Sequence, residues 1–246
     1  SVNSSVDEVN QYLEKAKKEL EELSSWNENA QELINSIKIL EKDVFARATK
    51  ISEKRKSFAS KMSSQIEQVL ANLGMAGSKF SVSITQKESS DLVQKCGPLG
   101  MDNVEFLICA NKGGELKPLA KIASGGEISR VMLAMKTILA ESDTVDTLIF
   151  DEIDSGISGS AAQKVGEKIS SISKEKQIIC VTHLAQIAAL ADTHFLISKQ
   201  SDGVVSKTEI NRLDKEGRIN EIARIISGGE MTANLRGTAE EMLNKH

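Results

Sequence analysis

The stretch that decides the fold is an apolar run that ends in two adjacent acids, Thr147-Leu148-Ile149-Phe150-Asp151-Glu152. Four apolar or β-branched residues without polar alternation predict a strand buried on both faces, as in the interior of a parallel sheet. Ligands of open α/β sheets bind at the carboxyl edge of the strands, where Asp151 and Glu152 would lie. In a nucleotide hydrolase the first acid helps to hold Mg²⁺ and the second polarises the attacking water. The alternative is that both acids only begin a solvated loop.

A second buried strand is predicted downstream, at residues 177–182, and His183 follows it directly. The segment between the two strands, residues 160–173, is expected to be helical. Strand, helix and strand within about 30 residues form a right-handed crossover, which places His183 at the same sheet edge as Glu152. A lone histidine is usually a satisfied polar residue, but one at an edge that carries two acids is expected to touch ligand.

The tetrapeptide Ser124-Gly125-Gly126-Glu127 precedes this unit and fits the S-x-x-E capping box, which by default indicates only that a helix begins there. Its two glycines would also let backbone N–H groups approach a phosphate at the helix N-terminus. The same tetrapeptide recurs as Ser227-Gly228-Gly229-Glu230. No buried strand follows this second copy, and it is interpreted as a plain cap or turn.

The first 73 residues predict one long helix with a heptad seam. Apolar residues recur at alternating steps of three and four, but Trp26 follows Leu23 by three residues where four are due. This irregularity indicates either a stammer or a break at Ser24-Ser25, and the prediction is a continuous helix. An S-x-x-E box at Ser5 is expected to start the helix, and Gly74 is expected to stop it.

A single apolar seam cannot bury itself, so this arm needs a partner helix, either from another copy or from a segment outside this sequence. The lower part of the arm is basic, with Arg47, Lys50, Lys54, Arg55, Lys56 and Lys61. These residues form either a solvated helix face or a contact for the phosphate backbone of DNA.

Composition limits the other function classes. The 246 residues carry a formal net charge of -4, so the chain has no global attraction for nucleic acid and any DNA contact must be local. Cys96, Cys109 and Cys180 lack metal-ligand spacing and are expected to pack as small apolar groups in a reducing cytosol. No apolar run is long enough to span a membrane and no signal peptide is visible, which predicts a soluble, cytoplasmic protein without membrane contact.

The remaining elements are predicted from shorter patterns. Strands are expected at residues 80–84, 104–108, 194–198 and 204–210, the last two antiparallel and joined by a turn at Asp202-Gly203. Helices are expected at residues 184–191, 218–226 and 232–243.

Together these motifs resemble ABC-type ATPases. Residues 123–127 resemble the signature motif, residues 148–152 resemble Walker B, Asp154-Ser155-Gly156 resembles the D-loop, and His183 resembles the switch histidine. Within this class the chain resembles the SMC-like RecN family of bacterial DNA-repair proteins, on residues 114–119, 151–159 and 182–188. The resemblance covers essentially the whole chain, as the C-terminal half of such a protein.

The resemblance implies an α/β fold, the C-terminal lobe of an ABC/SMC-type P-loop ATPase head with a mostly parallel sheet and flanking helices. Residues 1–73 would be a returning coiled-coil arm and residues 74–246 the lobe. The implied cofactors are ATP and Mg²⁺. Asp151 would position Mg²⁺, Glu152 would orient the water, and His183 would sense the γ-phosphate.

The resemblance also implies two heads that clamp two ATP molecules. Asp154 would couple the two sites across the dimer. The signature residues would contact the γ-phosphate bound by the opposite head, and they are Ser124, Gly125, Gly126 and Glu127. The implied partners are the N-terminal half of the same protein, a second head in an ATP-dependent homodimer, and DNA at the bacterial nucleoid.

One departure from the family pattern limits these expectations. The motif G-x-x-x-x-G-K-[ST], which cradles the β- and γ-phosphates, does not occur in these 246 residues. The chain alone is therefore expected to bind ATP weakly and to hydrolyse it hardly at all. The implied process is double-strand break repair and recombination. The alternatives are another SMC-like or recombination ATPase, and a non-catalytic coiled-coil interaction module.

Overall fold

The computed structural model describes residues 3–89, 92–140, 143–201, 206–228 and 233–244. The chain divides into two compact units. The helical unit comprises Ser1–Ser57 and Ile84–Asn103, and the α/β unit comprises Phe58–Ser83 and Val104–His246. Helix α1 (Asn3–Asn72) contributes to both units, as do strands β1 (Lys79–Gln86) and β2 (Asp102–Cys109).

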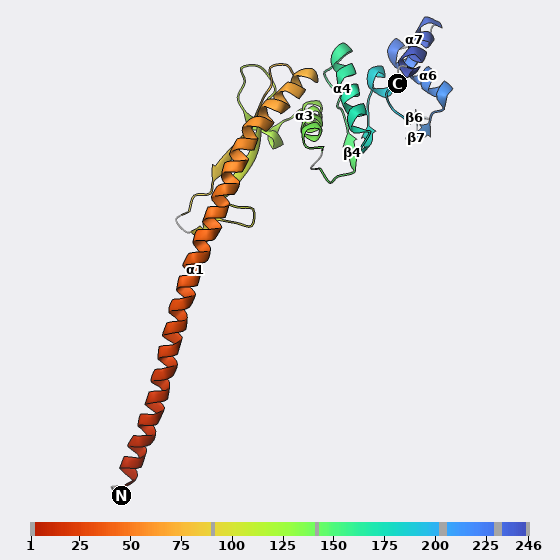
Figure 1. Ribbon diagram of the computed structural model, residues 1–246. Helices are drawn as coiled ribbons and strands as arrows, with labels where there is room; N and C mark the ends of the chain where they lie inside the picture. Colours follow the sequence, from red (N-terminus) through yellow and green to blue (C-terminus); the bar gives the residue numbers. More distant parts are fainter. Residues whose placement is uncertain (1–2, 90–91, 141–142, 202–205, 229–232, 245–246) are drawn as a thin grey trace. The chain divides into compact units, whose positions relative to one another are not determined.

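Helix α1 is continuous over 70 residues, so the predicted helix passes Ser24-Ser25 without a break (Figure 1). It begins at Asn3, two residues before the expected cap at Ser5. Gly74 and Gly77 follow its end with φ values of +80° and +92°, a left-handed conformation that glycine adopts without a steric penalty. The heptad seam of the helical unit is open to solvent, with Leu20 and Trp26 exposed at 68% and 75%.

In the helical unit, the excursion between β1 and β2 packs on α1 through a polar cluster. The Asp102 carboxylate is fully buried and accepts hydrogen bonds from Ser52 Oγ at 2.7 Å and from Arg55 Nη1 at 3.0 Å. Arg55 Nη2 also donates to the Leu99 carbonyl at 2.8 Å. Helix α2 (Leu92–Lys95) ends with Lys95 Nζ placed 6.0 Å from the centroid of the Phe45 ring. Arg55 is thus a packing residue within this unit.

The core of the α/β unit forms where the end of α1 meets the elements around the decisive strand. Helix α1 contributes Ile66 and Leu70, which are fully buried. Helices α3 (Gly125–Ile138) and α4 (Gly159–Ile172) contribute the fully buried Val131 and Val165. Strand β4 (Thr147–Phe150) adds Leu148 and Phe150. This cluster holds the ends of α3 and β4 in fixed relation.

Strands β4 and β5 (Gln177–Cys180) pair in parallel, with Thr147 opposite Gln177 and Phe150 opposite Cys180. Helix α4 connects them, which confirms the predicted strand-helix-strand crossover. Both strands are shorter than expected. The predicted ranges 147–152 and 177–182 begin at the observed residues but extend two residues past the C-terminal end of each strand.

The prediction that the β4 strand is buried on both faces is wrong for this chain. Leu148 and Phe150 are buried, whereas Ile149 is 69% exposed and Ile179 on β5 is 46% exposed. Helices α3 and α4 belong to the core that covers the Leu148 side, and no part of the described chain covers the Ile149 side. The sheet therefore has one apolar face that this chain leaves open.

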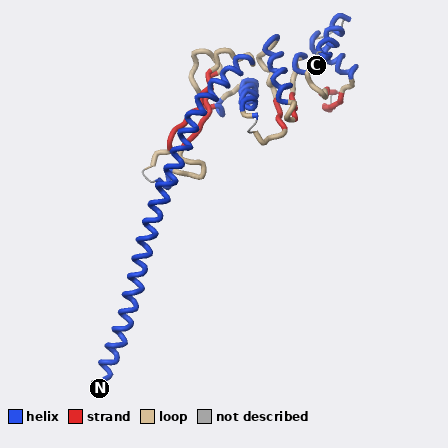
Figure 2. The backbone as a smooth tube through the Cα atoms, viewed as in Figure 1, coloured by secondary structure: helices blue, strands red, loops and turns tan. Residues whose placement is uncertain are grey.

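Two further strand pairs are antiparallel. In the α/β unit, β2 pairs with the short strand β3 (Lys117–Pro118), which leads into the 3₁₀ turn η1 (Leu119–Lys121). Strands β6 (Phe195–Ser201) and β7 (Ser206–Arg212) form the expected hairpin, although its turn at Asp202-Gly203 lies outside the described residues (Figure 2). Strands β1, β2 and β3 form one sheet in that order. The β2–β3 and β6–β7 connections are shorter than the dozen or more residues that a parallel crossover needs.

Three helices complete the unit, α5 (Ala185–Ala188), α6 (Lys215–Ser227) and α7 (Ala233–Asn244). They share a second small core around Ile222, Ala223 and Ala239. Among the described helices, none combines the length and apolar character that a membrane span requires.

Candidate functional site

The candidate site lies at the carboxyl edge of β4 and β5. Because Phe150 and Cys180 are opposite each other, both strands end at the same level, and Val181 N donates to the Phe150 carbonyl at 2.9 Å. Asp151 and Glu152 follow one strand, and Thr182 and His183 follow the other. The predicted placement of Glu152 and His183 at one edge is confirmed by this register.

Glu152 has a strained backbone. Its φ of +54° is the only positive value among the described residues other than glycine. A long side chain at positive φ is uncommon and is found preferentially at functional sites, where surrounding contacts hold it. Asp151 beside it is exposed, and its carbonyl accepts a hydrogen bond from Ser129 Oγ of α3 at 2.7 Å.

The first Ser-Gly-Gly-Glu copy begins α3, as the capping box predicts. Ser124 Oγ accepts a hydrogen bond from Glu127 N at 3.4 Å. The two glycines permit a close approach to the Glu152 loop. A Cβ atom on Gly125 would lie 2.6 Å from Glu152 Oε2, and one on Gly126 would lie 2.8 Å from the Cβ of Ser155. The N-terminus of α3 and the Glu152 carboxylate are therefore direct neighbours within this unit.

Arg130 fastens α3 to the same loop, a role that no sequence motif indicated. The side chain is buried, and its Nη1 donates to the carbonyls of Ile153 at 3.1 Å and Ser155 at 2.7 Å. Burial lowers the pKa of Arg130, while the carboxylates of Glu127 and Asp154 act in the opposite direction. An available signal was the arginine four residues after Gly126 and four before Ala134, on an otherwise small and apolar stripe of the helix.

Asp154 joins the two strand ends. Its side chain is 2% exposed, and its Oδ2 accepts hydrogen bonds from Thr182 Oγ1 and from His183 N, the latter at 2.8 Å. His183 Nδ1 lies 3.1 Å from the same oxygen, while the His183 side chain is 74% exposed. Thr182 is a second residue that the sequence analysis did not identify as part of the site.

Cys180 is the last residue of β5, two residues before Thr182. Burial, reinforced by the negative charges of Asp154 and Asp151, raises the pKa of its thiol to about 12. The expected role of Cys180 as a small packing group agrees with this environment, because a neutral thiol behaves as a small apolar side chain.

The second copy of the tetrapeptide ends a helix. Ser227 is the last residue of α6, and Gly228 forms its C-cap with a φ of +63°. Its interpretation as a plain cap or turn agrees with these two residues. Gly229 and Glu230 lie outside the described residues.

The sequence comparisons identify the family. No family model matches the chain. The DNA repair protein RecN of Treponema pallidum is 42% identical over 97% of this chain and 42% of its own length. RecN of Bacillus subtilis is 36% identical over 98% of this chain and 44% of its own length. The chain belongs to the RecN family. It spans less than half the length of these relatives, as a C-terminal portion.

Solved structures similar to this RecN-family chain are more distant. An Smc head domain with a coiled coil and joint from Pyrococcus yayanosii is 21% identical, with a TM-score of 0.46, over 87% of this chain and 36% of that one. An Smc head domain from Pyrococcus furiosus, bound to the C-terminal domain of ScpA, is 25% identical, with a TM-score of 0.42, over 66% of this chain and 37% of that one.

The residues present fit part of a site for a nucleotide and Mg²⁺. Mg²⁺ in nucleotide sites is bound by one or two carboxylates together with phosphate oxygens and water, and Asp151 offers one exposed carboxylate. Among the described residues, no cluster of three or more His, Cys, Asp or Glu could hold a metal alone. Asp151 would therefore share the ion with phosphate oxygens.

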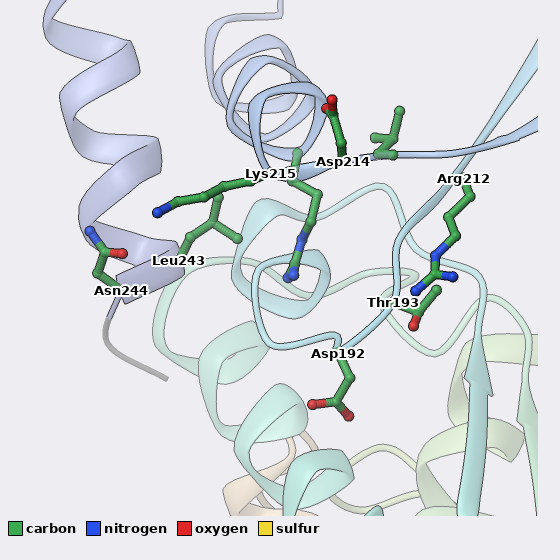
Figure 3. A pocket seen from close by; sticks show the side chains of 9 residues that line it. Asp192, Thr193, Arg212, Asp214, Lys215, Leu243 and Asn244 are labelled. Carbon is green, nitrogen blue, oxygen red and sulfur yellow. The ribbon is translucent and has the colours of Figure 1, made fainter.

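The described cavities lie elsewhere. One of about 320 Å³ is lined by residues around the start of α6 and the end of α7, among them Asp192, Arg212 and Lys215 (Figure 3). None of the predicted site residues lines it. Its acidic and basic side chains are mixed, and Asp214 already caps the N-terminus of α6.

Proposed function

We propose that this chain supplies the hydrolytic and trans-acting groups of a RecN-type ATPase that acts in DNA double-strand break repair and recombination. The observation that carries the proposal is the shared carboxyl edge of β4 and β5, which brings Asp151, Glu152 and His183 together. Two acids and an imidazole at one edge suit phosphoryl transfer to water, in which catalysis consists of positioning and electrostatic stabilisation. The N-terminus of α3, which lies against Glu152, has a separate role toward a second head.

The three edge residues have separate roles in this proposal. Asp151 holds Mg²⁺, which neutralises charge on the phosphate oxygens when it is bound. Glu152 orients the attacking water, and its strained backbone keeps the carboxylate at the strand end. His183, with an exposed ring, meets the γ-phosphate.

The signature residues act on ATP bound by a second head. The N-terminus of α3 presents backbone N–H groups and the positive end of the helix dipole, and Ser124, Gly125, Gly126 and Glu127 form this end. We assign Asp154 to coupling between the two sites across such a dimer.

The remaining nucleotide contacts come from the N-terminal portion of the same protein. That portion would carry the phosphate-binding loop that this chain lacks and an ascending helix for the seam of α1. The exposed apolar face at Ile149 and Ile179, and the exposed seam residues of α1, support such a partner. Less than half of the relatives' length is present here, which leaves room for it.

DNA is the proposed macromolecular substrate, at the bacterial nucleoid. With a net charge of -4, contact with DNA requires local basic surfaces. On α1, Lys50 and Lys54 are exposed and offer such a surface, whereas Arg55 is engaged by Asp102.

The deciding experiment measures ATP turnover by this chain alone, by the N-terminal portion alone, and by the two mixed, with and without double-stranded DNA. We expect turnover only in the mixture. Robust hydrolysis by this chain alone would contradict the proposed division of labour. Absence of turnover in a mixture that forms a stable complex would contradict the catalytic assignment.

The exposed seam of α1 also supports a second candidate, a non-catalytic coiled-coil module. Sedimentation velocity separates the two. A stable dimer of this chain that ignores the N-terminal portion supports the module, and a complex between the two portions supports the ATPase.

A further inference from the structure

We propose that Asp154 is a positioning residue that holds the His183 imidazole with a proton on Nδ1, so that Nε2 alone faces the ligand side of the sheet edge. This role operates within a single head. The catalytic use of His183 rests on the proposed function, whereas the protonation pattern of its ring does not.

The buried Asp154 carboxylate is surrounded by hydrogen-bond donors. Asp154 is 2% exposed, and a buried carboxylate is stable only when donors surround it. An ionised carboxylate accepts hydrogen bonds and donates none. Thr182 Oγ1 and His183 N donate to Oδ2, and His183 Nδ1 stands 3.1 Å from it. Against an ionised carboxylate, a proton on Nδ1 makes this contact attractive, whereas an unprotonated Nδ1 would turn its lone pair toward the charge.

The backbone on either side of His183 and of Asp154 is held by further hydrogen bonds. Thr182 Oγ1, which donates to Asp154, accepts a hydrogen bond from Leu184 N at 3.1 Å. The turn after β5 is thus fixed on both sides of His183. Arg130 in turn bonds the carbonyls on either side of Asp154, at Ile153 and Ser155. Both partners of the Asp154–His183 contact are therefore held by other groups.

This arrangement determines which nitrogen of His183 can meet a ligand. With Nδ1 3.1 Å from Asp154 Oδ2 and the ring 74% exposed, Nε2 is the ring nitrogen left for a ligand. In the neutral ring Nε2 accepts a hydrogen bond or a proton, as from water, and in the imidazolium it donates to an anion such as phosphate. A carboxylate that fixes the tautomer and supports the imidazolium is the arrangement found in hydrolytic triads.

The direct test is the ¹⁵N spectrum of the imidazole rings at alkaline pH, where they are neutral. The chain has three histidines, His183, His194 and His246, and a His183→Gln variant assigns the signal of interest. We expect a protonated Nδ1 and a bare Nε2 for His183 in the unmodified chain. A proton on Nε2 instead would overturn the proposal without any variant of Asp154.

Removal of the Asp154 carboxylate tests whether it sets the tautomer of His183. In Asp154→Ala we expect the ring of His183 to change to the Nε2–H tautomer. In the mixture with the N-terminal portion we expect kcat to fall about 10²-fold, while KM for ATP changes less than about twofold. The unchanged Nδ1–H tautomer in a folded Asp154→Ala variant would overturn the proposal.

The matched control is Asp143→Asn. Asp143 is another largely buried aspartate, and its carboxylate forms ion pairs with Lys136 and Lys176. It should leave both the His183 tautomer and kcat unchanged. If Asp154→Ala fails to fold, the spectrum of the unmodified chain still decides the question. A wild-type mixture without ATP turnover would count against the proposed function, while the tautomer would still report on Asp154.

Discussion

The two Ser-Gly-Gly-Glu copies have the same sequence and different structures. The copy at Ser124 begins α3, and its glycines are packed against the Glu152 loop. In the copy at Ser227, Ser227 and Gly228 end α6, and no atom of the described residues lies within 4 Å of a Cβ built on Gly228. The first copy needs glycine for space and the second for a positive φ. A capping motif thus identifies a helix end, while its neighbours decide whether that end belongs to a site.

The largest effect is expected at Glu152, which lies against the first copy. Glu152→Gln in the mixture with the N-terminal portion should lower ATP turnover at least about 10²-fold, because an amide cannot accept the proton of the attacking water. Binding of ATP, measured by fluorescence of a labelled analogue, should be retained. Unchanged turnover would remove Glu152 from the mechanism.

The next effect compares the two copies directly. Gly126→Ala should destabilise the fold by about 1–3 kcal/mol, since its Cβ would lie 2.9 Å from the Glu152 carbonyl oxygen as well as against Ser155. It should also lower turnover, because the loop must move. Urea denaturation and ATPase assays measure both quantities.

Gly228→Ala is the matched change in the second copy. Its Cβ meets no atom of the described residues, and the expected cost is the strain of a φ of +63°, about 1 kcal/mol. Turnover should stay at the wild-type value. Equal losses of turnover in the two variants would show that the copies do not differ in function.

A loss of stability similar to that of Gly126→Ala is expected from the side chain that holds the first copy in place. Arg130→Met should cost about 1–3 kcal/mol of unfolding free energy, because the buried Ile153 carbonyl loses its donor. The comparison variant is Arg47→Met on α1, where an exposed pair with Asp43 contributes less than about 0.5 kcal/mol. Similar midpoints in urea for both variants would contradict the structural role of Arg130.

The smallest effect concerns the opposite end of α3, at Lys136 and Asp143. The hydrogen bond from Lys136 is the main cause that lowers the pKa of Asp143 below its ordinary value of 3.8. A lowered pKa in the folded state contributes stability that is present above pH 3.8 and is lost as the pH falls through the folded-state pKa. The midpoint temperature of thermal unfolding should therefore fall less steeply for Asp143→Asn than for the wild type as the pH is lowered from 5 to about 2. Identical profiles would exclude this linkage.

Much of the fold could be predicted because its signals are local. The 3.5-residue period of the first 70 residues specifies a helix wherever that segment lies, and α1 follows it from Asn3 to Asn72. The order strand, helix, strand specifies a parallel pair, and so the meeting of Glu152 and His183 at one edge followed from connectivity alone. The domain boundary at residue 73, the residue roles and the weak ATP binding of the chain alone stay predictions.

Other features could not be predicted from periodicity. The apolar run at Ile149 has the pattern of a strand covered on both sides, but no described part of the chain covers one of them. Arg130 and Thr182 look ordinary in the sequence, and their roles arise from carbonyl and carboxylate groups more than 20 residues away along the chain.

The sequence by itself determined the elements of this protein, their order and the sheet edge at which its acids and its histidine meet, because helix period, strand length and crossover handedness are properties of short segments. Only the tertiary structure decided that Asp154 turns inward to His183, that two glycines allow α3 to lie against Glu152, and that one sheet face remains open. These outcomes depend on which surfaces and polar groups meet in space, and neighbours along the chain do not specify them.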